Sequence, residues 1–301
     1  MKKLLYSIII VISFVSCENM QTVIDVDLPP HEPKLVVNSV NEVGEKWKAY
    51  VSVSQAPLST TKFGFLSDAK VLLMDNQNVV DTLNYNASKN RYESDLIVQQ
   101  GTNLNIRVSH PMYNPLDASL YPFQKVMLKS VGELQSVTND NTSLKFTIDD
   151  PQSANYYMIN LKAYYSQDDV DTSDIWDNYY SEKEKIYFDS DDPSLNQGQF
   201  SRGKVLFDDK LFDGKTKEFS IFFNSYYVIE ADSILLNLWS VDYAFYNYFT
   251  TKITQSNTGD NPIFNSEPVN VYNSFLDGND EIQGYGVFAV SSRDSVIIHT
   301  E

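Results

Sequence analysis

The residue with the most specific chemistry in this sequence is Cys17, the only cysteine among its 301 residues. A lone cysteine cannot form an internal disulfide bond, so its thiol is available for other chemistry. Residues 1–16 in front of it begin with Met-Lys-Lys and continue with the apolar stretch Leu4–Val15. A helix of this length rises only about 18 Å, well short of the roughly 30 Å hydrocarbon core of a bilayer. Residues 1–16 are therefore interpreted as a lipoprotein signal peptide rather than a transmembrane helix.

The stretch Phe14-Val15-Ser16-Cys17 resembles a bacterial lipobox, in which a lipoprotein signal peptidase cuts before the cysteine and the thiol carries diacylglycerol. Phe14 departs from the leucine that is usual at its position. Acyl chains such as palmitate hold a protein firmly on a membrane, because each buried methylene contributes about 0.8 kcal/mol. We therefore expect covalent lipid attachment at Cys17 and a short tether over residues 17–21. An ordinary secretory signal with an incidental cysteine is the alternative.

Side chains that could carry catalysis are sparse. The chain has three histidines, His31, His110 and His299, and none of them lies in an H-E-x-x-H motif. Pro33 follows His31-Glu32 and would break the helix that this zinc motif needs. The sequence also lacks G-x-S-x-G, a P-loop and G-x-G-x-x-G. We therefore expect no enzymatic activity and no catalytic residue.

Residues 166–200 form a long acidic segment that we interpret as an insert in the second half of the chain. Carboxylate oxygens are the ligands that Ca²⁺ prefers, and Asp189, Asp191 and Asp192 are weak candidates for such a site. The rhythm Asp169-x-Asp171-x-Ser173 resembles the start of an EF-hand loop, but the required glycine and final glutamate are missing. A solvated acidic loop without calcium is the alternative. No other metal or cofactor is expected.

Four aromatic side chains stand within this polar segment: Trp176, Tyr179, Tyr180 and Tyr187. Tyrosine and tryptophan outside a core offer rigid contact area for a protein partner or a sugar ring. We treat them as candidate ligand or partner contacts. The alternative is that they pack the insert onto its own domain. On the binding interpretation, deletion of residues 168–198 should leave both cores folded.

The composition narrows the class of protein. With 40 acidic against 23 basic residues, the formal net charge is −17. Nucleic-acid binding depends on cationic groups that displace counterions, so this charge balance argues against it. No stretch after residue 16 is long and apolar enough to be a spanning helix, so the body is expected to be soluble. Without disulfides, the cores must be large enough to be stable alone.

The elements that position these residues are expected to be strands for the most part. Trp47–Ser54 and Leu104–Val108 alternate strictly between apolar and polar residues, and turn residues separate such segments at fairly even spacing. This pattern is typical of β-sandwiches. We place a first sandwich at residues 22–125 and a second at residues 126–301, with the acidic insert inside the second.

One helix is expected in the second half of the chain. Asp242 is a good N-cap, and the helix should run from there to about Ser256. Tyr243, Tyr246 and Phe249 recur at helical spacing, which favours a position in the core over a binding role.

Three groups of residues, taken in order, carry a resemblance to a known family. The first group follows the cysteine and comprises Val23–Asp27 and Pro33–Val37. The second lies in the first half of the chain and comprises Leu66–Val71, Arg91–Ser94 and Gly101. The third lies later in the chain and comprises Asp209–Lys215, Leu238–Tyr248 and Gly284–Phe288. Together they resemble a Bacteroidetes lipoprotein family, the domain-of-unknown-function family numbered 4249. The resemblance extends over nearly the whole mature chain. Gln283 departs from it, because the family tends to have a second glycine there.

This resemblance implies an outer-membrane lipoprotein without an assigned enzymatic activity, whose relatives are commonly encoded near TonB-dependent receptors. The first domain also resembles immunoglobulin-like sandwiches of the carboxypeptidase-regulatory or transthyretin type, and the second resembles a fibronectin-type sandwich. The membrane face on which the protein lies, periplasmic or cell-surface, stays open.

The function that we expect is that of a non-enzymatic accessory or binding subunit, held by its acyl anchor beside a TonB-dependent outer-membrane receptor. Independent capture of a glycan or peptide by the exposed aromatic residues is one alternative. A hydrolase with an unrecognised site is the other.

Overall fold

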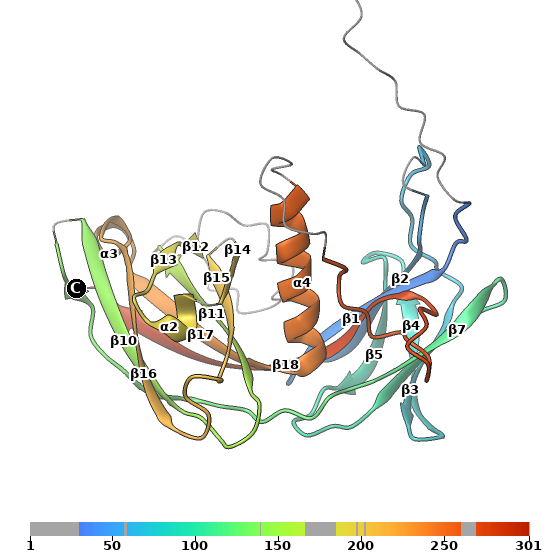
Figure 1. Ribbon diagram of the computed structural model, residues 1–301, viewed down its shortest axis with the longest axis horizontal. Helices are drawn as coiled ribbons and strands as arrows, with labels where there is room; N and C mark the ends of the chain where they lie inside the picture. Colours follow the sequence, from blue (N-terminus) through green and yellow to red (C-terminus); the bar gives the residue numbers. More distant parts are fainter. Residues whose placement is uncertain are drawn as a thin grey trace, which may run out of the picture. The chain divides into compact units, whose positions relative to one another are not determined.

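The structure is a computed structural model that describes most of the chain after the predicted signal peptide and tether. The described residues are 30–56, 59–138, 140–165, 185–196, 198–201, 203–259 and 269–300. They are mostly β, in two sheets with three short helices, which confirms the expected fold class. Residues from Pro33 onward form one compact unit (Figure 1).

Seven strands build the first half of this unit. They are β1 (Leu35–Glu42), β2 (Lys46–Val53), β3 (Lys70–Asp75), β4 (Asn78–Asn86), β5 (Arg91–Ile97), β6 (Asn105–His110) and β7 (Tyr113–Ser119). Neighbouring strands follow the order β1-β2-β5-β4-β3-β6-β7. Trp47, Ala49 and Val51 of β2 are buried, as the predicted alternation requires, but Val53 is only half-buried, and Lys48 and Ser52 on the other face are buried as well. The three buried apolar residues share one core with Leu73 of β3 and Ile106 of β6, so the two ends of this run of strands pack against each other.

The second half contains the remaining strands and the short helices. The strands are β8 (Leu128–Val131), β9 (Gln135–Ser136), β10 (Asn141–Asp149), β11 (Tyr156–Tyr164), β12 (Lys185–Ile186), β13 (Phe188–Asp189), β14 (Gln199–Ser201), β15 (Lys204–Asp208), β16 (Thr216–Asn224), β17 (Ser233–Val241) and β18 (Tyr285–His299). The helices are α2 (Pro193–Asn196), α3 (Tyr226–Glu230) and α4 (Tyr243–Gly259).

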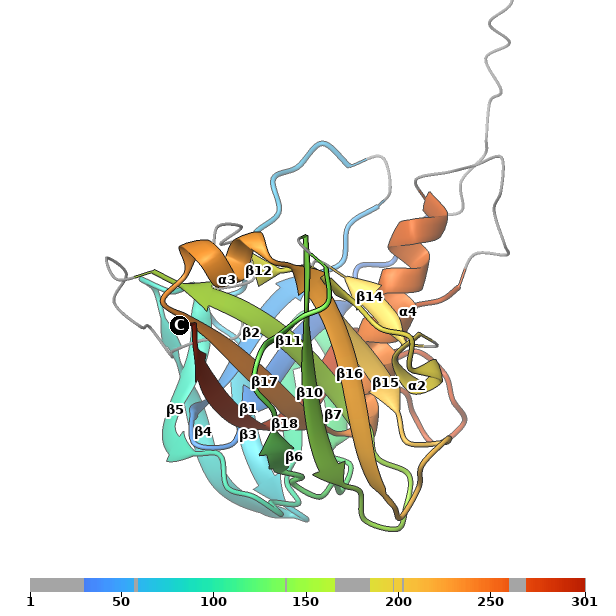
Figure 2. The same cartoon turned by 90° about the vertical axis from the view of Figure 1, so that its left-hand side faces the viewer.

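Two sheets face each other in this half. One has the order β13-β16-β10-β8, with β9 also on β10. The other has the order β14-β15-β11-β17-β18, with β12 also on β11, and continues through β1 into the first half (Figure 2). Phe146 of β10 and Phe219 of β16 stack at 5.0 Å and pack against Ile159 of β11 and Phe207 of β15. This arrangement is a β-sandwich with its own apolar core.

The described part of the acidic insert belongs to that second core. Ile186, Phe188 and Leu195 are buried among its apolar side chains. The expectation that residues 168–198 can be deleted without loss of the core is therefore wrong for residues 185–196. Three apolar residues scattered among acidic ones give no periodic pattern, so the sequence did not show which of them turn inward.

Strand β18 connects the two halves. Its residues up to Ser291 pair in parallel with β1, and those from Ser291 onward pair in antiparallel with β17. A single strand therefore supplies ladder hydrogen bonds to both halves. Phe288 and Val290 of β18, and Phe275 before it, lie in the first core. The predicted domain boundary near residue 125 stays a prediction, but these three residues near the end of the chain pack with the first half.

A glycine makes the contact between β1 and β18 sterically feasible. Gly286 pairs with Val37, and a Cβ atom at Gly286 would lie 2.0 Å from the carbonyl oxygen of Val37. Its φ of 113° is also one that residues with side chains rarely adopt. The close approach of these two backbones therefore requires glycine at this position.

An ionic contact between a half-buried arginine and a buried glutamate reinforces the same junction. Arg293 Nε lies 3.0 Å from Glu42 Oε1, and the indole of Trp239 donates a 3.3 Å hydrogen bond to Glu42 Oε2. These residues belong to β18, β1 and β17. Burial raises the pKa of Glu42, and the guanidinium of Arg293 opposes that shift.

Helix α4, which corresponds to the helix expected from the sequence, packs over this junction. Its Ala244 and Phe245 are buried against Val40 of β1, Trp239 of β17 and Ala289 of β18. Asp242 caps it, since its Oδ1 accepts a 2.8 Å hydrogen bond from the backbone N–H of Phe245. None of the described helices is long and apolar enough to cross a membrane.

Candidate functional site

The structure describes only part of the residues that the sequence put forward for binding. Cys17, Trp176, Tyr179 and Tyr180 lie outside the described residues. Tyr187 lies between β12 and β13 with 60% of its surface exposed. Its position suits a surface contact, and its role as one stays a prediction.

The three calcium candidates are not gathered around a common point in the described structure. Asp189 and Asp191 are exposed. Asp192 forms a 2.6 Å ion pair with Lys217 and accepts a 2.9 Å hydrogen bond from the backbone N–H of Ser194. Asp192 therefore already has a cationic partner and a capping role. Calcium at these residues stays a prediction.

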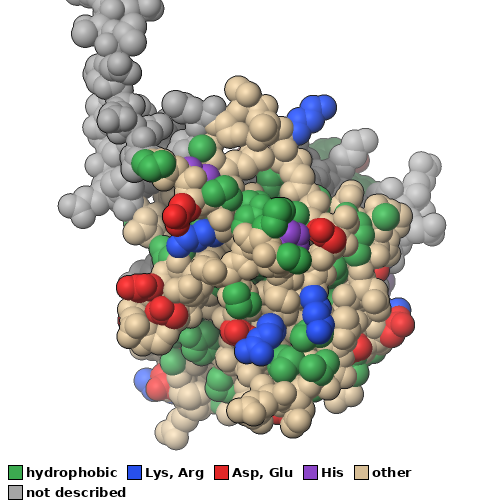
Figure 3. Space-filling view, turned by 90° about the vertical axis from the view of Figure 1, so that its right-hand side faces the viewer, with side chains coloured by type: hydrophobic (Ala, Val, Ile, Leu, Met, Phe, Trp, Pro, Cys, Tyr) green, Lys and Arg blue, Asp and Glu red, His purple; other side chains and the backbone are tan. Residues whose placement is uncertain are grey.

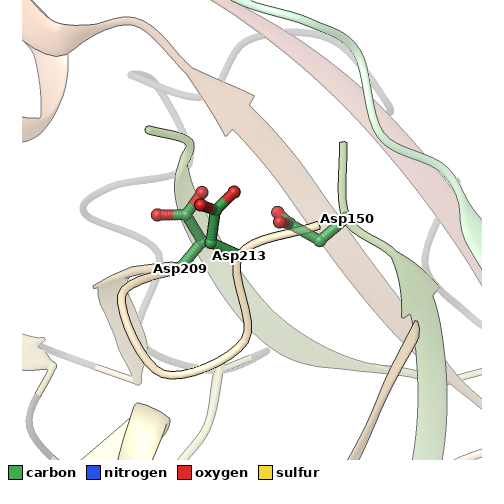
Figure 4. A group of neighbouring side chains, drawn as sticks. All are labelled: Asp150, Asp209 and Asp213. Atoms are coloured by element: carbon green, nitrogen blue, oxygen red, sulfur yellow. The ribbon is translucent and has the colours of Figure 1, made fainter. Parts of the chain in front are cut away.

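Carboxylates converge at a different place. Oxygen atoms of Asp150, Asp209 and Asp213 all lie within 4.8 Å of one another, at the turns between β10 and β11 and between β15 and β16 (Figure 4). Asp150 and Asp209 are buried, whereas Asp213 is exposed. Oxygen donors in this number suit a hard cation such as Ca²⁺.

Hydrogen bonds within this cluster show a structural role. Asp150 accepts hydrogen bonds from the hydroxyl of Tyr157 and, at 2.8 Å, from the backbone N–H of Gly214. Asp209 accepts from the backbone N–H of Asn155 at 2.7 Å, and Asp213 accepts from that of Ser153 at 3.1 Å. Each carboxylate thus bonds to the opposite turn or strand.

This arrangement makes the ionised forms of the buried aspartates less favourable. Burial raises the pKa of both Asp150 and Asp209, and the neighbouring carboxylates raise them further. The hydrogen bonds to Tyr157, Gly214 and Asn155 oppose that rise. The three aspartates therefore brace two turns of the second sandwich, and the geometry alone does not make them a metal centre.

A groove of about 590 Å³ lies at the end of β3, β6 and β7. Its size is within the range of small-molecule sites, which is about 300–1,000 Å³. The polar side chains that line it are those of Asn76, Asn105, Arg107, Asp117, Ser119, Tyr121 and Ser274.

The register of two strands sets the charges in this groove. Arg107 of β6 stands directly opposite Asp117 of β7, and its guanidinium donates two hydrogen bonds to the carboxylate, at 2.7 and 3.2 Å. Because these two charges compensate each other, the lining is close to neutral. Asn105 and Ser119 form the cross-strand pair two positions further along the same two strands, and neither side chain is hydrogen bonded to another described residue. They offer donors and acceptors to a ligand.

One tyrosine of the groove lining belongs to a larger cluster of tyrosines. Tyr121 lines the groove, and the ring of Tyr121 lies 5.0 Å from that of Tyr243 at the start of α4. Tyr272 contacts Tyr243 at 5.9 Å, and its hydroxyl lies 3.5 Å from that of Tyr121. Tyr156 of β11 continues the cluster to Tyr246, with which it stacks at 4.6 Å. We call these five residues the tyrosine cluster.

Asp242 holds the cluster in place. Its carboxylate is fully buried and accepts backbone N–H groups of Phe245, of Val290 and of Tyr121. The segment after β7, the first turn of α4 and strand β18 are thereby tied to one side chain. Burial raises the pKa of Asp242 to about 7, and the three hydrogen bonds oppose that shift.

The sequence predicted that Tyr243, Tyr246 and Phe249 lie in the core, and the structure agrees for two of the three. Phe249 and Tyr246 pack against the apolar cluster beneath α4, as expected for core residues. Tyr243 is 41% exposed and Tyr121 is 43% exposed. The helical spacing of residues 243, 246 and 249 could not show that the first turn of α4 projects beyond the sheet. Tyr121 carried no sequence signal, because its neighbours in the cluster are distant along the chain.

Comparison with known families identifies the chain at this point. A family model described as "Domain of unknown function (DUF4249)" matches residues 21–296. The chain belongs to the DUF4249 family. This confirms the suspected resemblance at the level of the family.

Other comparisons add little to the DUF4249 assignment. No curated protein matches the chain. A solved structure described as "Putative membrane anchored protein from Corynebacterium diphtheriae" is similar at 11% identity and a TM-score of 0.23. The match covers 73% of this chain and 57% of that protein's length, and a TM-score this low supports no argument about fold or function.

The arrangement of this DUF4249 protein is suited to binding. A neutral groove with unused amide and hydroxyl groups can hydrogen bond an uncharged polar ligand, and the ring of Tyr121 in its lining can stack on a planar or ring-shaped group. The two charged side chains in the groove, Arg107 and Asp117, are paired with each other. Such a pair orients a ligand more readily than it transfers a proton.

Proposed function

We propose that this DUF4249 protein is a non-enzymatic binding protein, anchored to the outer membrane by lipid on Cys17, that acts as an accessory subunit beside a TonB-dependent receptor. The observation that carries the binding role is the groove that Tyr121 lines. Its volume, its neutral lining and the tyrosine cluster that Tyr121 joins to it are properties of a recognition site. Cys17, its preceding apolar segment and the family resemblance support the anchoring.

Tethering provides the mechanism. An acyl anchor confines the protein to the plane of the membrane, so it meets a membrane partner at a raised effective concentration. A modest contact at the groove then suffices for stable association. Such a subunit holds a ligand, or a loop of the receptor, close to the receptor's opening without any covalent step.

A pull-down tests the accessory role. Full-length protein is recovered from its native outer membrane in mild detergent, and the associated proteins are identified by mass spectrometry. We expect a TonB-dependent receptor in stoichiometric amount. Cys17→Ala should remove the protein from the membrane fraction and lose the receptor. Retention of the Cys17→Ala variant in membranes would refute lipid anchoring.

A matched pair of variants tests whether the groove is involved. Tyr121→Ala combined with Tyr243→Ala removes the exposed rings beside the groove, whereas Tyr226→Ala removes an exposed ring from α3 of the second sandwich. Loss of exposed aromatic contacts typically weakens binding by about 1–3 kcal/mol, or roughly 5- to 150-fold. We expect this loss with the double variant and none with Tyr226→Ala. Equal weakening of binding by the double variant and by Tyr226→Ala would exclude the groove as the binding site.

Independent capture of a glycan or peptide is the second candidate function. The unbonded groups of Asn105 and Ser119 and the neutral Arg107–Asp117 pair favour an uncharged, hydroxyl-rich ligand such as a glycan over a charged peptide. Recovery of the protein without a receptor would support this function. Binding screens with glycans and neutral peptides, using the same tyrosine variants, would then identify the ligand class.

A further inference from the structure

One end of the first sandwich carries exposed apolar side chains. The strand register defines this end, because the start of β1 pairs with the end of β2 and the start of β3 pairs with the end of β6. Phe63 and Phe65, in the segment between β2 and β3, are 60% and 40% exposed. Met112, in the turn between β6 and β7, is 72% exposed. We call Phe63, Phe65 and Met112 the apolar rim.

Contacts hold this rim in a defined arrangement. The rings of Phe63 and Phe65 meet edge to face at 5.2 Å, and Phe65 rests against Tyr50 of β2 at 5.8 Å. The backbone beside Phe65 is fixed to β2, since the N–H of Leu66 donates to Val51 at 2.8 Å. Exposed apolar side chains that are held at one end of a sandwich suit contact with an apolar partner.

The two segments of the rim are also linked to each other. Asp68 Oδ1 lies 3.4 Å from His110 Nε2, which joins the segment after Phe65 to the turn that carries Met112. Figure 3 views the side of the molecule on which β2 and β7 lie in Figure 1, and it shows exposed hydrophobic side chains in its upper half. Charges of both signs are scattered among them, without a large patch of one sign.

The predicted anchor segment enters the sandwich at this same end. Leu35 pairs with Val53, and the backbone N–H of Ser54 donates a 2.9 Å hydrogen bond to Lys34. Lys34, from which the chain leads back towards Cys17, and Ser54, from which it continues towards Phe63, therefore lie side by side. Roughly 17 residues separate Cys17 from Lys34, and they can span at most about 60 Å.

We propose that the apolar rim rests on the lipid surface to which Cys17 is anchored, as a second and non-covalent membrane contact. This inference rests on the lipid anchor of the proposed function. Aromatic side chains settle readily at the interface between headgroups and acyl chains, and the anchor keeps the rim within reach of it. The net charge of −17 opposes adsorption to anionic lipid, so the rim contacts the membrane through its apolar groups.

The contact fixes how the binding groove is presented. Asn76, Asn105 and Ser119 of the groove lie at the opposite end of β3, β6 and β7 from the rim. With the rim on the lipid, the groove points away from the membrane. A ligand or receptor segment then reaches the groove without passing the lipid surface.

A fluorescent label tests the contact in the full-length, lipidated protein. Acylation occupies Cys17, so an added cysteine is the only free thiol. Gly64→Cys places the label between the two phenylalanines, at a position with open space around it. Gln77→Cys is the matched control, because it lies in the turn at the opposite end of β3, beside the exposed Val79 and Val80. Both proteins are reconstituted into phosphatidylethanolamine–phosphatidylcholine vesicles, with and without brominated lipid.

We expect brominated lipid to quench the label at position 64 and to leave the label at position 77 unchanged. Phe63→Ser combined with Phe65→Ser should abolish the quenching at position 64, while the protein still floats with the vesicles. Flotation without quenching at position 64 overturns the rim contact and leaves the lipid anchor intact. Failure to float refutes the anchor and the rim contact together. Equal quenching at both positions would show adsorption without the proposed orientation and overturn it too.

Discussion

At the scale of single residues, Asp242 connects three parts of the molecule. Its buried carboxylate accepts hydrogen bonds from α4, from β18 and from the segment that follows β7. An ionised carboxylate in a buried position is unfavourable unless hydrogen bonds compensate it. Here the compensation is incomplete, since the pKa of Asp242 is raised to about 7.

This raised pKa predicts a pH-dependent stability. Between about pH 4 and pH 7 the folded protein keeps a proton on Asp242 that the unfolded chain has released, so the free energy of unfolding falls as the pH rises through this window. The shift of roughly 3 pKa units corresponds to about 4 kcal/mol. Urea unfolding at pH 4, 5, 6, 7 and 8 measures this decrease in the free energy of unfolding.

The variant Asp242→Asn separates this effect from other titrating groups. Asparagine does not titrate, so the slope of stability against pH should become flatter by the contribution of Asp242. Glu42, Asp150 and Asp209 also have raised pKa values, and they act in both proteins alike. Parallel curves for the two proteins would contradict the prediction.

Among the elements, β18 determines how the two halves are joined. It pairs in parallel with β1 and in antiparallel with β17, and helix α4 covers the junction. Parallel pairing needs a long connection between the strands, and here most of the chain lies between β1 and β18. Gly286 stands near the start of this pairing, where a Cβ atom would collide with the backbone of Val37.

Two glycine substitutions test this junction. Gly286→Ala should destabilise the protein by roughly 3 kcal/mol or more, because its Cβ would collide with the backbone of Val37 and its φ is unfavourable. Gly278→Ala has open space around it and should change stability by less than about 0.5 kcal/mol. Thermal unfolding of both variants measures the difference. Similar stabilities would mean that β1 and β18 separate readily.

For the molecule as a whole, the shared strand predicts that the first half does not fold alone. A fragment of residues 22–125 lacks Phe275, Phe288 and Val290, which complete its core, and leaves the edge of β1 unpaired. We expect poorly dispersed amide resonances and no cooperative unfolding transition. A longer chain, in which a flexible linker joins residues 270–292 to the fragment, should show well-dispersed amide resonances and a cooperative unfolding transition.

A cooperative transition of the 22–125 fragment alone would contradict this prediction. It would also show that the boundary near residue 125, set from the strand pattern, marks an independent domain. The linked chain is the control for the fragment's solubility, because it contains the same residues with the missing core supplied.

The sequence predicted much of the local structure. Alternation in β2 identified Trp47, Ala49 and Val51 as buried, but it did not show that Lys48 and Ser52 on the other face are buried too. The N-cap at Asp242 placed the start of α4. Such features depend on neighbouring residues, so they are readable along the chain. Trp176, Tyr179 and Tyr180 lie outside the described residues, so their role in binding stays a prediction. The groove was not predicted from the sequence.

The groove could not be predicted because its parts are far apart in the chain. Tyr121, Tyr243 and Tyr272 meet only when β7, α4 and the segment before β18 fold together. The charges of Arg107 and Asp117 in its lining compensate each other only because the register of β6 and β7 places these two residues opposite each other.

By itself, the sequence determined the mostly β class, the family, the helix with its cap, and the lone cysteine that motivates a lipid anchor. These properties follow from composition, short-range periodicity and ordered motifs. Only the tertiary structure decided that β18 serves both halves, that residues 185–196 complete a core, and which tyrosines are exposed. The physical reason is that these features depend on long-range packing and strand register, which hydrophobic patterning of single segments does not specify.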